Sequence, residues 1–256
     1  MTALAGAFWD AATMTRRDLI HSFRSPGTTA IALITPVFLL FMFVYVFGGS
    51  FSVGSAYIDF VAPGILMITA TYGSSMTAVR LAADMKEGII DRFRTMAITR
   101  GSVLTGQVVG SVVRTAFSCL VLLAIMLAMG FRPVVDPMAW LAAAGLLLLV
   151  ILAITWVTVA GALLAKTPEG ASYSTILVVL LPFVSSAFAP TQKMPGPVRW
   201  FAENQPFTPI IDTLRALFMG TPVGHSWITG VAWCVGFTIL GYAGAKLLFA
   251  RDRVRN

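Results

Sequence analysis

The sequence predicts an all-α polytopic membrane protein with six transmembrane helices, and three observations support this fold class. Hydrophobic residues make up 57% of the 256 residues and charged residues only 11%, a balance that a water-soluble globule of this length cannot accommodate. The apolar residues form long runs, each close to the about 20 residues with which a helix crosses the hydrocarbon core. The runs are continuous, whereas the strands of a membrane barrel would alternate with a period of two.

Six such runs give the expected spans and their orientation. They cover Thr28–Phe47, Ile58–Val79, Val103–Met129, Met138–Leu164, Ala171–Ala189 and Trp227–Phe249. Lys and Arg near span ends are retained on the cytoplasmic side, and the side holding both chain ends would carry 13 of the 18 cations. We therefore expect both termini in the cytoplasm. The net charge of +7 then reflects this bias and contact with anionic membrane lipids, and it requires no nucleic-acid partner.

Two segments outside the spans have an amphipathic pattern. Residues 1–25 place apolar side chains at helical spacing beside three arginines, which predicts an interfacial amphipathic helix that serves as a topological anchor or contacts a cytoplasmic partner. Residues 190–226 are too apolar for a simple linker, so we expect an external element of short helices between the fifth and sixth spans; an ordered surface loop is the alternative. Since no internal repeat is visible, one integral membrane domain is expected to fill residues 1–256.

The segment 84–100 carries seven charged side chains between the second and third spans. Asp84, Glu87 and Asp91 follow one another at spacings of three and four, so on a helix they would form an acidic stripe. Cations follow toward the C-terminal end, and isoleucines with a phenylalanine supply an apolar face. Such a helix can dock into a groove on a soluble partner and pass force to the adjacent spans. A solvated loop that obeys the cytoplasmic charge bias is the alternative.

Ionisable side chains are scarce inside the spans, and this limits the chemistry that they can support. Spans three to six contain no Asp or Glu, and Asp59 sits at the outer entrance of span two. Proton-coupled transport normally needs intramembrane carboxylates, and an intramembrane enzyme needs a nucleophile with its base or clustered metal ligands. The nearest match to a phosphate-binding loop, Gly101–Val108, lacks the Lys and the Ser or Thr that contact phosphate and Mg²⁺. We therefore expect this chain to bind no metal or cofactor, and any ATP to be bound by another polypeptide.

Arg114 is the one cation that falls inside an expected span. It would lie about 16 Å along the third span from Val103 if the whole segment is helical. In one interpretation it belongs to the transport pathway, where its guanidinium lines a polar cavity and meets an anionic substrate. In the other, the helix begins later than Val103 and the side chain reaches the interface. Both interpretations are compatible with the sequence.

Four motifs occur in the order found in a known family. They are Thr15–Pro26, Tyr57–Gly64, Glu87–Arg94 with Arg100, and Asn204–Arg215. Together they resemble the ABC type-2 exporter permease family, particularly its daunorubicin-resistance-like branch, and the resemblance extends over nearly the entire chain. It implies that two copies of a separate ATP-binding subunit, which uses ATP and Mg²⁺, engage coupling helices on a pair of permeases. The second permease would be another copy of this chain or a sister permease.

The resemblance also suggests roles for individual residues. The residues expected to couple to the ATPase are Glu87, Gly88, Asp91, Arg92 and Arg94. The residues expected to shape the outer gate and the external helices are Asp59, Pro63, Gly64, Asp212 and Arg215. The resulting hypothesis is the permease subunit of an ATP-driven exporter in a bacterial plasma membrane, which moves an amphipathic drug-like compound, secondary metabolite or lipid. The alternatives are an ion-coupled secondary transporter without an ATPase, and a membrane immunity or scaffold protein that transports nothing.

Overall fold

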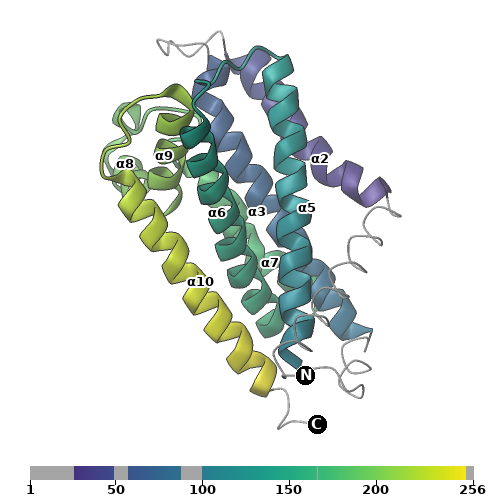
Figure 1. The fold of residues 1–256 in the computed structure, drawn as a ribbon. Helices are drawn as coiled ribbons and strands as arrows, with labels where there is room; N and C mark the ends of the chain where they lie inside the picture. The colour runs from purple at the N-terminus through teal and green to yellow at the C-terminus, as the bar shows by residue number, and fades with distance from the viewer. Residues whose placement is uncertain (1–25, 49–56, 88–99, 166, 252–256) are drawn as a thin grey trace.

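The structure is a computed structural model that describes residues 26–48, 57–87, 100–165 and 167–251, and over these residues it contains helices and no strand (Figure 1). The long helices are α2 (Pro26–Phe41), α3 (Tyr57–Lys86), α5 (Arg100–Ala128), α6 (Pro137–Ala165), α7 (Pro168–Leu180) and α10 (Ser226–Arg251). The short elements are the π-helix η1 (Met42–Phe47), the 3₁₀-helices η2 (Leu181–Val184) and η3 (Thr191–Lys193), and the helices α8 (Gly196–Asn204) and α9 (Phe207–Met219). The predicted all-α fold class is therefore confirmed for the described part of the chain.

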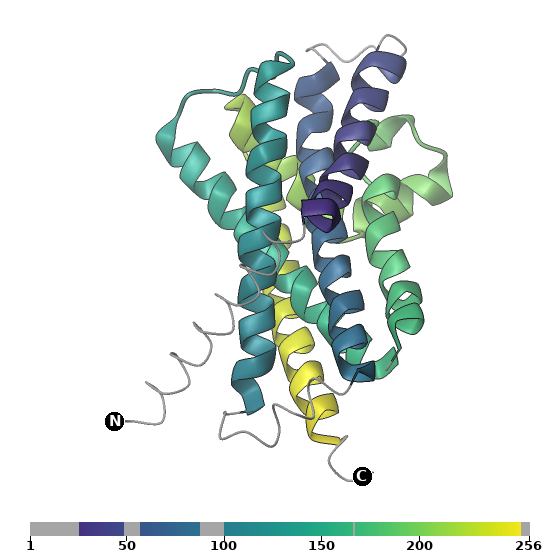
Figure 2. The ribbon, with the colours of Figure 1, turned by 90° about the vertical axis from the view of Figure 1, so that its right-hand side faces the viewer.

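Helix α3 forms the centre of the bundle. It contacts α2, α5, α6, α7 and α9, and Figure 2 shows it behind α2 with α5 on one side and α7 on the other. Residues 61–71 are all buried, as expected for a helix that is surrounded by other helices. Helix α10 lies on the outside of this arrangement and packs on α6 and α9. A shift of α3 would therefore change its packing contacts with α2, α5, α6, α7 and α9.

Three of the described helices are long and apolar enough to cross a membrane. These are Leu104–Ala128, Pro137–Ala165 and Ser226–Phe249. Two further apolar helices are shorter, over Leu33–Phe47 and Pro168–Val184. The fifth expected span, Ala171–Ala189, is helical only as far as Val184, because Pro182 removes a backbone donor and the chain turns after η2. Helix α3 is 30 residues long, but its buried Ser and Thr side chains make it less apolar than α6.

Residues 190–226, where the sequence predicts short helices, contain the α-helices α8 and α9. Pro195 and Pro206 directly precede α8 and α9, a position where the missing backbone donor is harmless. Helix α9 ends at Gly220, whose φ of 65° is readily adopted only by glycine, and its backbone N–H donates to the Ala216 carbonyl. The loop between α5 and α6 lies beside α9, since the Val134 N–H donates to the Phe218 carbonyl over 2.8 Å. We call this end of the bundle the α9 end.

Two segments to which the sequence assigns a role lie outside the described residues. They are the interfacial helix expected over residues 1–25 and most of the segment 84–100, of which residues 88–99 are not described. The described parts of the latter segment belong to the long helices themselves. Helix α3 continues to Lys86 and α5 begins at Arg100, so both helices project at the end of the bundle opposite the α9 end.

Candidate functional site

Arg215 is the centre of a polar network at the α9 end. Its Nη1 donates to Asp212 Oδ1 over 2.7 Å on the same helix, and its Nη2 donates to the Ser186 carbonyl over 2.6 Å. Its Nε donates to the Phe60 carbonyl of α3 over 3.2 Å, and the guanidinium carbon lies 4.0 Å from the centre of the Phe60 ring. One side chain therefore joins α9, the segment after η2 and the central helix α3. We call Phe60, Ser186, Asp212 and Arg215 the Arg215 network.

The network is closed by a second contact to Asp212. The Ser186 hydroxyl donates to Asp212 Oδ1 over 2.7 Å, so the carboxylate binds both Arg215 and the segment that Arg215 contacts. Burial lowers the pKa of the Arg215 guanidinium, while the neighbouring Asp212 carboxylate opposes this change. A guanidinium stays protonated in proteins, so the network is a permanent ion pair with hydrogen bonds on most of its donors.

Pro63 and Gly64 explain why α3 meets the network at this level. Pro63 lies inside α3 and has no N–H to donate to the Asp59 carbonyl. The helix therefore lacks one backbone hydrogen bond beside Phe60, where it can kink. At Gly64, an added Cβ would lie 2.6 Å from the Ala187 Cβ and 3.0 Å from its Cα. The two backbones therefore touch at a point where only glycine fits. Four of the five predicted outer residues therefore lie at one junction: Pro63, Gly64, Asp212 and Arg215.

Asp59 belongs to a different contact. Its Oδ1 accepts a hydrogen bond from the Arg132 backbone N–H over 3.3 Å, which ties the start of α3 to the loop between α5 and α6. Tyr57 makes a comparable tie, since its hydroxyl donates to the Phe188 carbonyl over 3.1 Å. The roles of Phe60, Tyr57 and Ser186 were not predicted from the sequence. The interruption of an apolar run by two serines shortly after Pro182 is the signal that could have indicated Ser186.

The predicted coupling residues are only partly described. Glu87 is exposed in a turn directly after α3, whereas Gly88, Asp91, Arg92 and Arg94 lie outside the described residues. The sequence predicts that Asp84 shares an acidic stripe with Glu87 and Asp91. In the structure its Oδ2 instead accepts a hydrogen bond from Gln107 Nε2 over 3.0 Å. Asp84 therefore contacts α5 from within α3, in contrast to the exposed position of Glu87.

Arg114 lies near the middle of α5. The helix begins at Arg100, about 21 Å away along the axis, so the interpretation in which it begins later than Val103 is wrong. The guanidinium donates through Nη2 to Thr77 Oγ1 over 2.8 Å, and the Thr77 and Ser111 hydroxyls lie 2.7 Å apart. Arg114 is only half-buried, and it extends a polar strip between α3 and α5.

The polar strip extends from the α3–α5 contact to α6. At the next turn of the α3–α5 contact an added Cβ on Gly73 would lie 2.5 Å from Thr115 Oγ1, so Thr115 packs directly on the α3 backbone. The Ser74 and Thr155 hydroxyls lie 3.0 Å apart, and Thr158 donates to the Ser74 carbonyl over 3.2 Å. The contacts of α3 with α5 and α6 therefore include a series of Ser and Thr hydroxyls, which are common where membrane helices pack closely.

Within the described residues, no group of three His, Cys, Asp or Glu side chains lies close enough together to hold a metal ion. Cys119 and Cys234 are separate buried thiols, which pack in the apolar core. The polar groups that the Arg215 network and the strip between α3, α5 and α6 bring together are hydroxyls, backbone carbonyls, the Arg114 and Arg215 guanidiniums and the Asp212 carboxylate.

Comparison with known proteins decides the family. The family model described as ABC-2 type transporter matches residues 11–219. The chain belongs to this family. It is 29% identical over 224 residues to the daunorubicin resistance ABC transporter permease protein DrrB1 of Streptomyces coeruleorubidus, which covers 85% of this chain and 75% of that protein. Residues 11–219, which the family model matches, include the Arg215 network, Arg114 and the whole of segment 84–100.

Two further relatives belong to other lineages. The chain is 25% identical over 183 residues to the probable doxorubicin resistance ABC transporter permease protein DrrC of Mycobacterium tuberculosis, a match that covers 70% of this chain and 65% of that protein. It is 26% identical over 252 residues to the putative transport permease ycf38 of Porphyra purpurea, covering 92% of this chain and 82% of the relative. The resemblance seen in the sequence motifs is thus confirmed. The ABC-2 chain is a membrane permease subunit of an ABC exporter, and the ATPase of such a transporter is a separate subunit.

Proposed function

We propose that this permease exports an amphipathic, drug-like compound, with daunorubicin and doxorubicin as the first compounds to test. The names of two relatives, which refer to resistance to these compounds, support this substrate class. In the proposed complex the ABC-2 chain pairs with a second copy or a sister permease. Two ATPase subunits bind ATP and Mg²⁺ for the pair, and membrane lipids surround it.

The proposed placement has six spans in a bacterial plasma membrane with both termini in the cytoplasm. The distribution of Lys and Arg supports this orientation, which puts Glu87 on the inner side and the α9 end on the outer side. Three apolar helices of sufficient length agree with an integral membrane protein. In this arrangement one integral domain fills residues 1–256, and α8 and α9 form the external element over residues 190–226.

The observation that carries the proposal is the course of α3 between the two ends. The helix runs without interruption from Phe60, which accepts the Arg215 hydrogen bond, to Lys86, directly before Glu87. The 26 steps from Phe60 to Lys86 correspond to about 39 Å of helix. A push delivered at Glu87 can therefore travel along one continuous helix to Pro63, which adjoins the Arg215 network. We infer that α3 transmits the motion of the ATPase to an outer gate.

In the proposed gate, the Arg215 network holds α3, α9 and the segment after η2 together in the closed state. Hydrogen bonds to charged groups stabilise a fold by about 1.5 to 3 kcal/mol each. Gly64 lets the α3 backbone pack directly against Ala187. A small shift of α3 would therefore either separate the two residues or press them into overlap. Pro63 weakens α3 beside the contact and gives the helix a place to bend.

We further propose that Arg114 lines the transport pathway. Its partner Thr77 lies on α3, the helix proposed to move, and both face a strip of hydroxyl groups. An intramembrane cation is retained where it meets water, a polar partner or a polar part of a substrate. A shift of α3 against α5 would change the position of the guanidinium and expose the strip to a passing molecule.

Export by the purified complex tests this function. The full chain would be placed in proteoliposomes together with its ABC ATPase subunit, to be sought first in the neighbouring reading frames, and daunorubicin movement would be followed by fluorescence. The proposal predicts transport that requires both subunits and ATP hydrolysis. Transport by the ABC-2 chain alone under an ion gradient would instead indicate a secondary transporter, and binding without transport would indicate a scaffold or immunity protein.

A further inference from the structure

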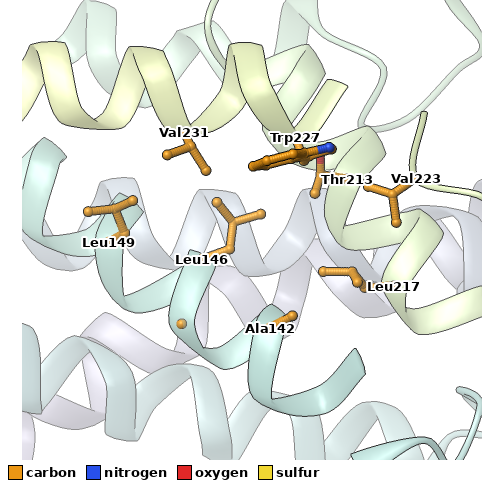
Figure 3. A pocket seen from close by; sticks show the side chains of 9 residues that line it. Ala142, Leu146, Leu149, Thr213, Leu217, Val223, Trp227 and Val231 are labelled. Atoms are coloured by element: carbon orange, nitrogen blue, oxygen red, sulfur yellow. The ribbon is translucent and has the colours of Figure 1, made fainter. Parts of the chain in front are cut away.

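A pocket of about 450 Å³ lies between α6, α9 and α10, on the side of α9 away from the Arg215 network (Figure 3). Its lining residues come from all three helices and from the loop before α10. They are Ala142, Gly145, Leu146, Leu149, Thr213, Leu217, Val223, Trp227 and Val231. In Figure 3 the Trp227 ring extends across the space between α10 and α9, opposite Leu146 and Leu217. This volume lies within the range of small-molecule sites.

The pocket is apolar in character. None of the described residues that line it carries a charge, and Thr213 contributes its only side-chain hydroxyl. That hydroxyl donates to the Pro209 carbonyl within α9 over 2.7 Å, which leaves the Thr213 methyl group as its contribution to the wall. A buried water needs several polar partners, so water is not a suitable occupant. The remaining candidates are hydrocarbon groups.

The pocket arises because α6 and α10 diverge toward the α9 end. Farther along, the two helices touch at Gly241, where an added Cβ would lie 2.7 Å from the Trp156 carbonyl carbon. There Trp156 and Tyr242 also pack edge to face, with ring centres 5.0 Å apart. Figure 1 shows α10 moving away from α6 as both approach α9. Helix α9 inserts into this opening without filling it.

The pocket is continuous with the surface that faces the hydrocarbon core of the membrane. Both α6 and α10 are apolar enough to span a membrane, and large apolar side chains beside the pocket are exposed, including Leu141, Leu148 and Ile228. The pocket begins five residues after the start of α6, at Ala142, and extends to Leu149, or about 8 to 18 Å along this helix. The hydrocarbon that reaches a lateral opening at this depth is the acyl chain of a lipid.

We propose that this pocket is a binding site for one acyl chain of a membrane lipid at the α9 end. The site depends on α6 and α10 crossing the bilayer, and it does not depend on which compound is exported. A bound chain would pack against Leu217 and Thr213, whereas Asp212 and Arg215 of the same helix form the Arg215 network. The lipid would therefore support α9 from the side opposite the network and help to hold Arg215 in position.

Gly145 allows the pocket to be filled with little disturbance. No described atom lies within 4 Å of a Cβ added at this position, so Gly145→Leu projects into open space. Gly236 on α10 provides a matched control, since no described atom lies near its added Cβ and it does not line the pocket. Both substitutions add the same side chain to an apolar helix, and only one of them occupies the proposed site.

The test uses the full chain with its ATPase in nanodiscs that contain a phospholipid with a photoactivatable diazirine in its acyl chain. After illumination, mass spectrometry maps the labelled residues. We expect stronger labelling at Leu146, Leu149 and Val231 than at Leu240, an exposed apolar residue farther along α10. Gly145→Leu should reduce the pocket labelling to the level of Leu240, and Gly236→Leu should leave it unchanged.

Several results would overturn the proposal. Equal labelling of the pocket and Leu240 in the unsubstituted protein would show ordinary lipid contact, and this comparison needs no variant. Pocket labelling that persists in a folded Gly145→Leu protein would place the chain elsewhere. Displacement of the label by daunorubicin would assign the pocket to the exported compound. The last result would reject the lipid and leave the proposed export function intact.

Discussion

Arg215 contacts Phe60 twice, through a hydrogen bond from Nε to the backbone carbonyl and through the guanidinium above the aromatic ring, 4.0 Å from its centre. A planar guanidinium can donate at its edge and stack on its face, whereas an ammonium group lacks this geometry. The contact joins α9 to α3 three residues before Pro63. It connects α9 of the ABC-2 chain to the helix that leads to Glu87.

Replacement of Arg215 should weaken the fold. The Arg215 side chain is 18% exposed and the Asp212 side chain 41% exposed, so the ion pair itself is partly screened by solvent. Arg215→Ala also removes the hydrogen bonds to the Phe60 and Ser186 carbonyls, and it should lower the free energy of unfolding by about 2 kcal/mol. Arg215→Lys should recover only part of this loss. It keeps the positive charge but lacks the planar set of N–H donors that reaches Asp212, Phe60 and Ser186 together. Thermal unfolding of the detergent-purified protein, followed by its intrinsic fluorescence, measures both variants.

Arg199 provides the control for this experiment. It pairs with Glu203 on α8 over 2.8 Å, but the two side chains are 47% and 39% exposed. A surface pair of this kind contributes at most about 1 kcal/mol, so Arg199→Ala should leave the melting temperature almost unchanged. Equal losses for Arg199→Ala and Arg215→Ala would contradict a special role for the Arg215 network.

Gly64→Ala should separate α3 from the segment that carries Ala187. The new Cβ would lie 2.6 Å from the Ala187 Cβ, and the neighbouring backbone must move to relieve the overlap. Extra methyl groups in a tightly packed contact cost about 1 to 3 kcal/mol, and we expect export to fall together with stability. Proteoliposome transport and thermal unfolding measure the two effects.

Gly244→Ala is the matched substitution at an ordinary contact. An added Cβ there would lie 3.7 Å from the Ala160 Cβ, a normal packing distance. Alanine is the better helix former by about 1 kcal/mol, so this variant should be as stable as the original protein or more so. If Gly64→Ala also retains full export and stability, close approach at Gly64 has no part in gating.

Arg114→Cys tests whether the polar strip meets water. In a protein with Cys119→Ala and Cys234→Ala, a membrane-impermeant methanethiosulfonate reagent should modify Arg114→Cys, and ATP should change the rate. The thiolate is the reactive form, and it exists only where water or polar groups stabilise it. Leu120→Cys, at an exposed apolar position on the same helix, should stay unmodified. Failure to modify position 114 with and without ATP would remove Arg114 from the pathway.

The sequence predicts the helices better than their contacts. Continuous apolar runs indicate the all-α fold, and amphipathic spacing indicates the stretches that α8 and α9 cover. Asp212 and Arg215 are three residues apart on one helix, so their proximity follows from helical periodicity. The Phe60 and Ser186 carbonyls that complete the network have no sequence signature, because every residue has a carbonyl.

Other differences have local causes. The hydropathy of residues 171–189 suggests one span, but Pro182 ends regular helix within it. Asp84 has the spacing of the acidic stripe, yet it lies on the extended α3 and contacts Gln107. The pocket between α6 and α10 depends on the angle between two helices, which side-chain periodicity on either helix alone cannot supply.

Photocrosslinking in the assembled transporter measures most directly whether an ATPase drives α3 from Glu87. A benzoylphenylalanine would replace Glu87 in one variant and Arg132, beside Asp59 at the α9 end, in another. We predict a crosslink to the ATPase subunit from position 87 and none from position 132, with the yield at position 87 changing upon ATP addition. A crosslink to the ATPase from position 132 with none from position 87 would contradict both the proposed orientation and the proposed drive.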